Sequence, residues 1–73
     1  MDTMPFLHAD RAFSIVFFED LGFTEVRKIL DELLAENAFS PEVQEQHGFY
    51  LINVENASFS VWVSDMEVII KRT

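Results

Sequence analysis

Several segments of this sequence are strand-like and apolar on both sides, whereas only one segment has the period of an amphipathic helix. Residues 12–19 read AFSIVFFE. Successive side chains of a strand point to opposite faces, and here both sets contain large apolar residues, which is typical of a strand buried on two faces. A helix with one apolar stripe covers one face of a sheet. We therefore expect a sheet with more apolar surface than its helix can cover.

The helix is predicted over residues 24–37. Its apolar residues recur at spacings of three and four, at Val26, Ile29, Leu30, Leu33 and Leu34. This spacing places them along one side of an α-helix. Thr24 is the expected N-cap, because its hydroxyl can accept a hydrogen bond from an unpaired amide of the first turn.

Three further strands are predicted at 49–55, 59–64 and 67–72, where β-branched and aromatic residues gather. The connections between them are short enough for hairpins. Consecutive hairpins form an antiparallel meander, so these three strands are expected to lie side by side in chain order.

Two other stretches carry weaker patterns. Residues 1–11 contain Pro5 and no clean periodicity, and they are expected to be a loosely ordered lead-in. The run Ser40-Pro41-Glu42 is typical of a helix start with proline at the first helical position. It predicts a short helical turn near 41–47.

The element order β-α-β-β-β predicts an α+β fold in one domain, 1–73. Its natural form has two layers, a four-stranded, mostly antiparallel sheet with one amphipathic helix packed on one face. The place of the first strand stays open. A right-handed crossover can lay it parallel to a strand of the meander, and an antiparallel position at the sheet edge is equally compatible with the sequence.

Sorting the strand residues by parity separates two faces. The set expected to meet the helix comprises Phe13, Ile15, Phe17, Tyr50, Ile52, Val54, Phe59, Val61, Val63, Val68 and Ile70. The apolar residues of the other set are Val16, Phe18, Phe49, Leu51, Trp62 and Ile69. We predict that these form a protein interface, because a bare apolar patch of this size is unusual on a monomer. The alternative is that the N-terminal segment, with Phe6 and Leu7, folds over this face.

Charge limits the classes of partner. Thirteen Asp and Glu stand against five Lys and Arg, a net charge of −8. Such a chain is repelled by phosphate backbones and anionic membranes, so direct binding to nucleic acid or membrane is not expected. The sequence has no cysteine, no stretch long enough to span a membrane and no basic residue before Arg11 to begin a signal peptide. A cytoplasmic location fits these features.

No pattern of catalytic or metal-binding residues stands out. His8 and His47 are the two histidines, and their neighbours Asp10 and Glu45 lack a recognised metal-site spacing. The serines have no nucleophile motif, and the two glycines are too far apart to form a phosphate-binding loop. We predict a protein that is not an enzyme and needs no cofactor or metal.

Three hypotheses for function remain. The first is a protein-binding module that inhibits or modulates a larger protein. In its sharpest form, acidic side chains replace nucleic-acid phosphates on a nucleic-acid-binding protein, and the candidates are Glu25, Asp31, Glu32 and Glu36. Small acidic phage-encoded inhibitors of restriction or CRISPR systems work in this way, although the comparison rests on size and charge alone. The second is a structural homodimer or assembly subunit joined through the second sheet face. The third is a carrier of a small apolar ligand.

Overall fold

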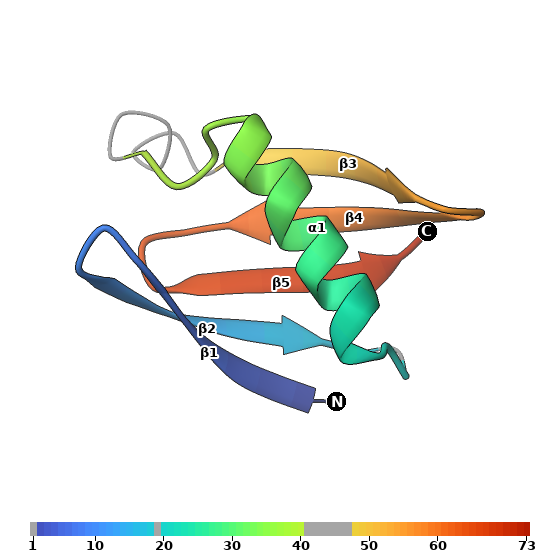
Figure 1. Cartoon of the computed structure of the whole chain (residues 1–73), viewed down its shortest axis with the longest axis horizontal. Coiled ribbons are helices and arrows are strands. Elements are labelled where there is room, and N and C mark those ends of the chain that lie inside the picture. The colour runs from blue at the N-terminus through green and yellow to red at the C-terminus, as the bar shows by residue number, and fades with distance from the viewer. Residues whose placement is uncertain (1, 19, 41–47) are drawn as a thin grey trace.

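The computed structural model describes residues 2–18, 20–40 and 48–73. The described elements are β1 (Asp2–His8), β2 (Arg11–Phe17), α1 (Phe23–Ala35), β3 (Phe49–Val54), β4 (Ala57–Val63) and β5 (Glu67–Arg72). The strands form one sheet in the order β1-β2-β5-β4-β3, and α1 crosses one face of it (Figure 1). The α+β class with one helix on the sheet is therefore confirmed.

The sheet has five strands and mixed pairing, so the predicted four-stranded, mostly antiparallel sheet is wrong in detail. β1 pairs antiparallel with β2, and β2 pairs parallel with β5. The meander β3-β4-β5 is antiparallel, as predicted. β2, the strand whose place the sequence left open, thus lies parallel to β5 and is second from the edge of the sheet.

The extra strand is β1, and the lead-in predicted for residues 1–11 is wrong. β1 pairs with β2 along its whole length, from Asp2 opposite Phe17 to His8 opposite Arg11. The proline that argued against a strand is tolerated because β1 is an edge strand, where a missing backbone N–H need not break the ladder. Ala9 and Asp10 form the connecting turn, both with positive φ, at 51° and 62°.

The helix starts one residue earlier than predicted and ends two residues sooner. Its N-cap is Gly22 and not Thr24, and the Glu25 carboxylate accepts a hydrogen bond from the Gly22 amide. At the other end Asn37 adopts φ 58°, and the Ala38 amide donates to the Leu33 carbonyl at 2.9 Å. This closing pattern reverses the chain and stops the helix.

The remaining boundaries differ from the prediction by a few residues. β2 begins at Arg11 and ends at Phe17, β3 ends at Val54, and β4 runs from Ala57 to Val63, whereas β5 coincides with the predicted strand. The short helical turn predicted near 41–47 lies outside the described residues.

The core forms between α1 and the sheet, as the parity of the strand residues predicts. Every residue assigned to the helix side is buried except Tyr50, which is partly buried. Val26, Ile29, Leu30 and Leu33 of α1 are at most 1% exposed. Ala38 and Phe39, which follow the helix, also enter this core.

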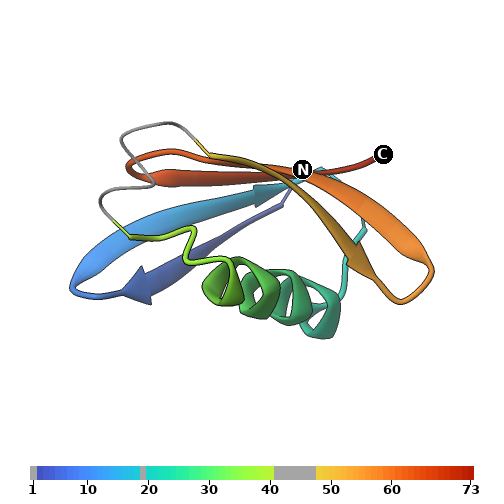
Figure 2. The same ribbon diagram turned by 90° about the horizontal axis from the view of Figure 1, so that it is seen from above.

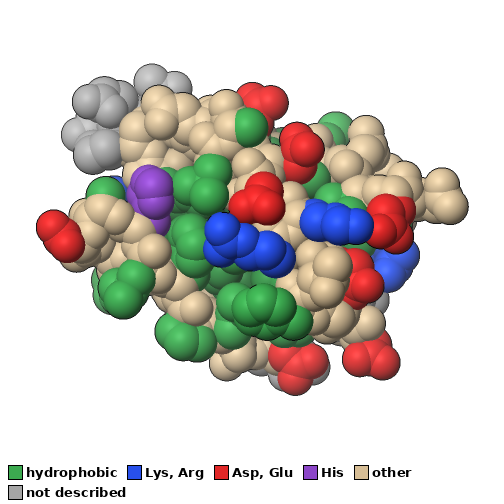
Figure 3. Space-filling view, viewed as in Figure 1, with side chains coloured by type: hydrophobic (Ala, Val, Ile, Leu, Met, Phe, Trp, Pro, Cys, Tyr) green, Lys and Arg blue, Asp and Glu red, His purple; other side chains and the backbone are tan. Residues whose placement is uncertain are grey.

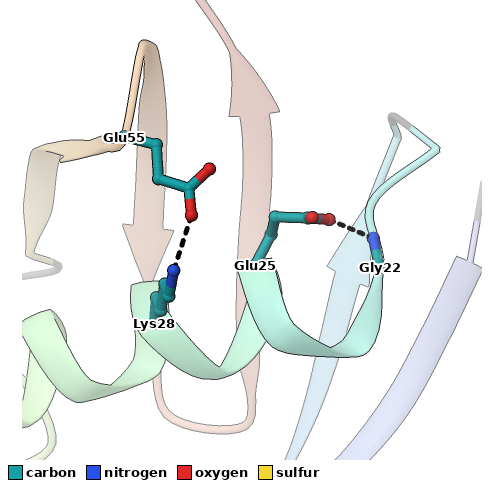
Figure 4. Close-up of polar contacts among 4 residues, drawn as sticks. All are labelled: Gly22, Glu25, Lys28 and Glu55. Carbon is teal, nitrogen blue, oxygen red and sulfur yellow. Dashed lines mark hydrogen bonds and ion pairs between the residues drawn. The ribbon is translucent and has the colours of Figure 1, made fainter.

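One ion pair ties α1 to the turn between β3 and β4 (Figure 4). Lys28 Nζ lies 2.6 Å from Glu55 Oε1, with both side chains largely exposed. The hydrogen bond and charge of Lys28 lower the pKa of Glu55 below its ordinary 4.5. The hydrogen bond that Lys28 donates to Glu55, followed by the negative charge of Glu55, raises the pKa of Lys28 above 10.5.

The pair gives a testable pH dependence. A carboxylate with a lowered pKa stabilises the fold above about pH 4.5, and this contribution is lost as the pH falls through the lowered value. The raised pKa of Lys28 acts oppositely: its contribution is present below pH 10.5 and is lost as the pH rises through the raised value. In an NMR titration, Lys28→Met is expected to move the pKa of Glu55 upward. Arg27→Met is the matched control. It should leave the pKa of Glu55 unchanged, because Arg27 pairs with Asp31, at 3.3 Å, and not with Glu55.

Candidate protein-interaction face

The sheet face opposite α1 is the candidate site, and we refer to it as the open face. Viewed edge-on, the sheet has α1 on one side, and no described helix or strand lies over the other side (Figure 2). Five of the six apolar residues predicted to form an interface belong to this face, because they alternate with the buried helix-side residues along their strands. The sixth, Phe18, directly follows β2, and its ring lies on this face beside the Lys71 ammonium.

Four of the six lie in one row across neighbouring strands. Val16 pairs with Ile69, Ile69 with Trp62, and Trp62 with Phe49. The Phe49 and Trp62 rings are 5.1 Å apart at an interplanar angle of 53°. Val16 is buried by its neighbours and Ile69 is partly buried, so the row is a continuous apolar strip that ends in two exposed rings. We call this strip the central row.

A second row runs beside it and contains the other two predicted residues. Lys71 pairs with Ser60, and Ser60 pairs with Leu51. Phe18 follows Phe17, which pairs with Ile70, so Phe18 stands beside Lys71. The Lys71 ammonium lies 4.9 Å from the centre of the Phe18 ring and 5.9 Å from that of Trp62. The contacts of Lys71 with these two rings depend on the order of the strands in the sheet and have no signal in the local sequence.

The large side chains of the open face are substantially exposed. The exposed fractions are 42% for Trp62, 45% for Phe18, 51% for Phe49 and 68% for Leu51. An aromatic side chain buries about 150–250 Å² when fully covered, so the three rings together leave roughly 300 Å² in contact with water. With Leu51 the exposed area falls in the range of the largest apolar patch on a typical monomer, roughly 300–600 Å², and such a patch is often functional.

The open face is nearly neutral in a strongly acidic chain. Among the described strand residues that point to this side, the charged ones are Glu67 and Lys71, both on β5. On the helix side, by contrast, acidic and basic side chains are interspersed over the surface (Figure 3). Most of the charge is thus kept away from the apolar rows.

The N-terminal segment does not cover the open face, so the alternative of a fold-over arm is wrong. β1 extends the sheet at its edge and turns Phe6 to the helix side. There the Phe6 ring lies 5.1 Å from that of Phe39 and 6.2 Å from that of Phe13. Leu7 points away from this cluster and is 76% exposed.

The four acidic candidates lie on α1 or at its end but do not form one free acidic surface. Glu25 is turned toward the Gly22 amide, and Asp31 pairs with Arg27. Glu32 and Glu36 are exposed, and neither forms an ion pair with another described residue. Two of the four therefore stabilise the helix locally, and two remain available to a partner.

Other candidate chemistry is sparse within the described ranges. His8 is the last residue of β1, and the centre of its ring lies 5.6 Å from that of Phe39. His47 lies outside the described residues. In residues 2–18, 20–40 and 48–73, no group of three or more His, Cys, Asp or Glu residues is placed to hold a metal ion.

Two open hollows are formed by described residues, and one of them borders the central row at Thr3, which pairs with Val16. One of about 340 Å³ is lined by Asp20, Glu25, Glu55 and Arg72 among others. In it Glu25 and Glu55 already have partners within the fold. Another, of about 380 Å³, lies between β1, β2 and Met66. Neither brings together an acid, a base and a nucleophile.

None of the described helices has the length and apolar character needed to cross a membrane. Comparison of the chain with protein-family models, curated proteins and solved structures found no match.

Proposed function

We propose that this chain is a non-enzymatic protein-binding module whose working surface is the open face of the sheet. The observation that carries the proposal is the group of four exposed apolar side chains around Trp62 on a nearly neutral face of a chain with net charge −8. Tryptophan flanked by small polar residues is typical of an interface anchor, and here Ser60 and Ser64 flank it along β4. Burying these side chains supplies the driving force for association.

A protein partner is favoured over a nucleic acid by charge. Sheets that bind single-stranded nucleic acid combine stacked aromatic rings with a positively charged groove. The open face has the rings, but its single lysine is balanced by Glu67, and the acidic chain repels phosphates at longer range.

A protein partner is also favoured over a small ligand. Ligand sites are concave and enclose most of the ligand surface. The exposed rings of Trp62, Phe49 and Phe18 instead project from one side of a sheet, a shape that suits another flat surface.

A second candidate uses the helix side of the molecule. Glu32 and Glu36 are exposed and without an ion pair among the described residues, so α1 can present carboxylates to a basic surface. In this role the chain is an inhibitor that occupies the site of a nucleic-acid-binding protein, as anti-restriction and anti-CRISPR proteins do. Such binding weakens steeply with added salt, whereas binding through the open face depends mainly on apolar burial.

Site-specific photo-crosslinking tests both candidates. p-Benzoylphenylalanine is placed at Phe49 on the open face, or at Glu32 on α1 as the matched exposed control, and the full chain is illuminated in cells of its own organism. We expect a protein adduct from the Phe49 probe that is lost when Trp62→Ser is added. An adduct from the Glu32 probe alone would favour the inhibitor role, and the absence of adducts from both probes would contradict both roles.

A further inference from the structure

We infer that the open face binds a second copy of this chain, face to face, about a two-fold axis that runs across the strands along the central row. The inference rests on the proposed function, because it names the partner of the same surface. Three features support it: the symmetric placement of two charges on β5, the position of the central row, and the concentration of acidic charge on the other surfaces.

The two charges of the open face lie symmetrically about Ile69. Glu67, Ile69 and Lys71 point to this face from β5, which is the middle strand of the five-stranded sheet. Each charged residue is two positions from Ile69. At about 3.3 Å per residue, their Cα atoms are roughly 13 Å apart, one on each side of the central row.

Face-to-face packing of identical surfaces requires a two-fold axis in the plane between the sheets. An axis along the strands would place Lys71 opposite Lys71 and Glu67 opposite Glu67. An axis across the strands through Ile69 reverses β5, so that Lys71 of each copy lies opposite Glu67 of the other. Opposed like charges are unfavourable at an interface, so the charge pattern selects the axis across the strands.

This axis also places the central row against itself. Residues on the axis meet their own counterparts, so Ile69 and Trp62 of one copy pack on Ile69 and Trp62 of the other. Packed sheets lie about 10 Å apart with their strands rotated by about 30°. Lysine and glutamate side chains reaching from opposite sides span that separation.

In the proposed dimer, Glu67 of one copy neutralises Lys71 of the other, which loses contact with water when the face is covered. The Lys71 ammonium lies over Phe18 and Trp62, so any partner that buries these rings also removes water from Lys71. A desolvated ammonium requires a counter-charge. Glu67 is exposed and forms no ion pair with a described residue, so a second copy provides that carboxylate.

The distribution of the remaining charge is compatible with self-association. Two chains of net charge −8 repel each other where their acidic surfaces meet. Contact through the nearly neutral open face keeps α1 and its acidic residues on the outside of both copies. The exposed acidic surface then disfavours the addition of further copies.

The test is a charge exchange on the full chain, with the dissociation constant measured by sedimentation equilibrium. The wild-type chain is expected to be a dimer at about 100 μM or below. Lys71→Glu and Glu67→Lys are each expected to weaken the dimer by at least about tenfold, because each opposes like charges at both pairs. The double variant restores opposite charges and is expected to return within about threefold of wild type.

The outcomes separate the inference from the proposed function. A wild-type monomer at 100 μM overturns the inference, and the crosslinks from Phe49 then decide the proposed function. Failure of the double variant to restore the dimer overturns the two-fold axis. Phe18→Ser combined with Trp62→Ser should give a monomer by sedimentation equilibrium, and circular dichroism should show that this variant is folded. A dimer that survives this change, as edge pairing through β3 would, overturns the face-to-face arrangement, and the crosslinks from Phe49 then decide the proposed function.

Trp62 also provides an independent optical readout, because it is the only tryptophan of the chain. Its emission is expected to shift to longer wavelength on dilution, as the dimer separates and the ring enters water. The concentration at the midpoint should match the sedimentation constant. Emission that stays constant across that range contradicts burial of the central row.

Discussion

Replacing Phe59 with Ala is expected to destabilise the protein by about 3–5 kcal/mol and to leave a measurable fraction unfolded at 25 °C. Phe59 is 1% exposed and lies on β4 between the sheet and α1, so truncation leaves a cavity that the surrounding strands cannot close. A domain of 73 residues has a total stability of roughly 4–11 kcal/mol. The loss is therefore comparable with the whole free energy of unfolding.

Urea denaturation followed by circular dichroism measures this effect, and Phe23→Ala is the matched control. Phe23 is 73% exposed at the start of α1 and lies outside both the core and the open face. Its truncation is expected to change the free energy of unfolding by less than about 0.5 kcal/mol. Equal losses in the two variants would contradict the assignment of the core to the α1 side of the sheet.

The second large effect is a gain of stability in the turn between β1 and β2. Ala9 and Asp10 both have positive φ, a conformation that costs an L-residue roughly 1–2 kcal/mol. Asn-Gly is the preferred pair for a two-residue turn of this kind. Ala9→Asn with Asp10→Gly is therefore expected to stabilise the protein by about 1–2 kcal/mol, seen as a rise in Tm of roughly 4–16 °C.

Asp65→Gly separates the turn effect from the removal of an acidic charge. Asp65 lies in the connection between β4 and β5 and has no positive φ. Asp65→Gly removes one negative charge, as Asp10→Gly does. It also raises the conformational entropy of the unfolded chain, and it relieves no backbone strain because Asp65 has no positive φ. A lower Tm is expected. If Asp65→Gly raises the Tm as much as the turn variant does, charge repulsion and not backbone strain is the cause.

The two faces of the sheet could be predicted because side-chain alternation depends on the local chain alone. Ile15 and Val61 face α1, whereas Trp62 and Phe18 face away, as their parity requires. β1 could not be predicted in this way. Pro5 argues against a strand unless the segment is known to form the sheet edge, and edge position is a property of the assembled sheet.

The candidate site was predicted in composition but not in its arrangement. The six apolar residues share one face, as local alternation requires. Their order in two rows depends on the parallel pairing of β2 with β5, which joins segments about fifty positions apart and leaves no local signal. The same pairing brings Lys71 beside Phe18, so this contact could not be predicted from the sequence, although strand parity alone places Lys71 on the open face.

The position of β5 has a consequence for synthesis of the protein. β5 follows all the other described strands in the chain, yet it is the middle strand and joins the hairpin β1-β2 to the hairpin β3-β4. While a ribosome is still making residues 67–72, α1 is already present, but the two hairpins have no strand between them with which both can pair. Completion of the sheet therefore waits for this segment to leave the exit tunnel, and until then the sheet edges that β5 will later occupy stay open to chaperones.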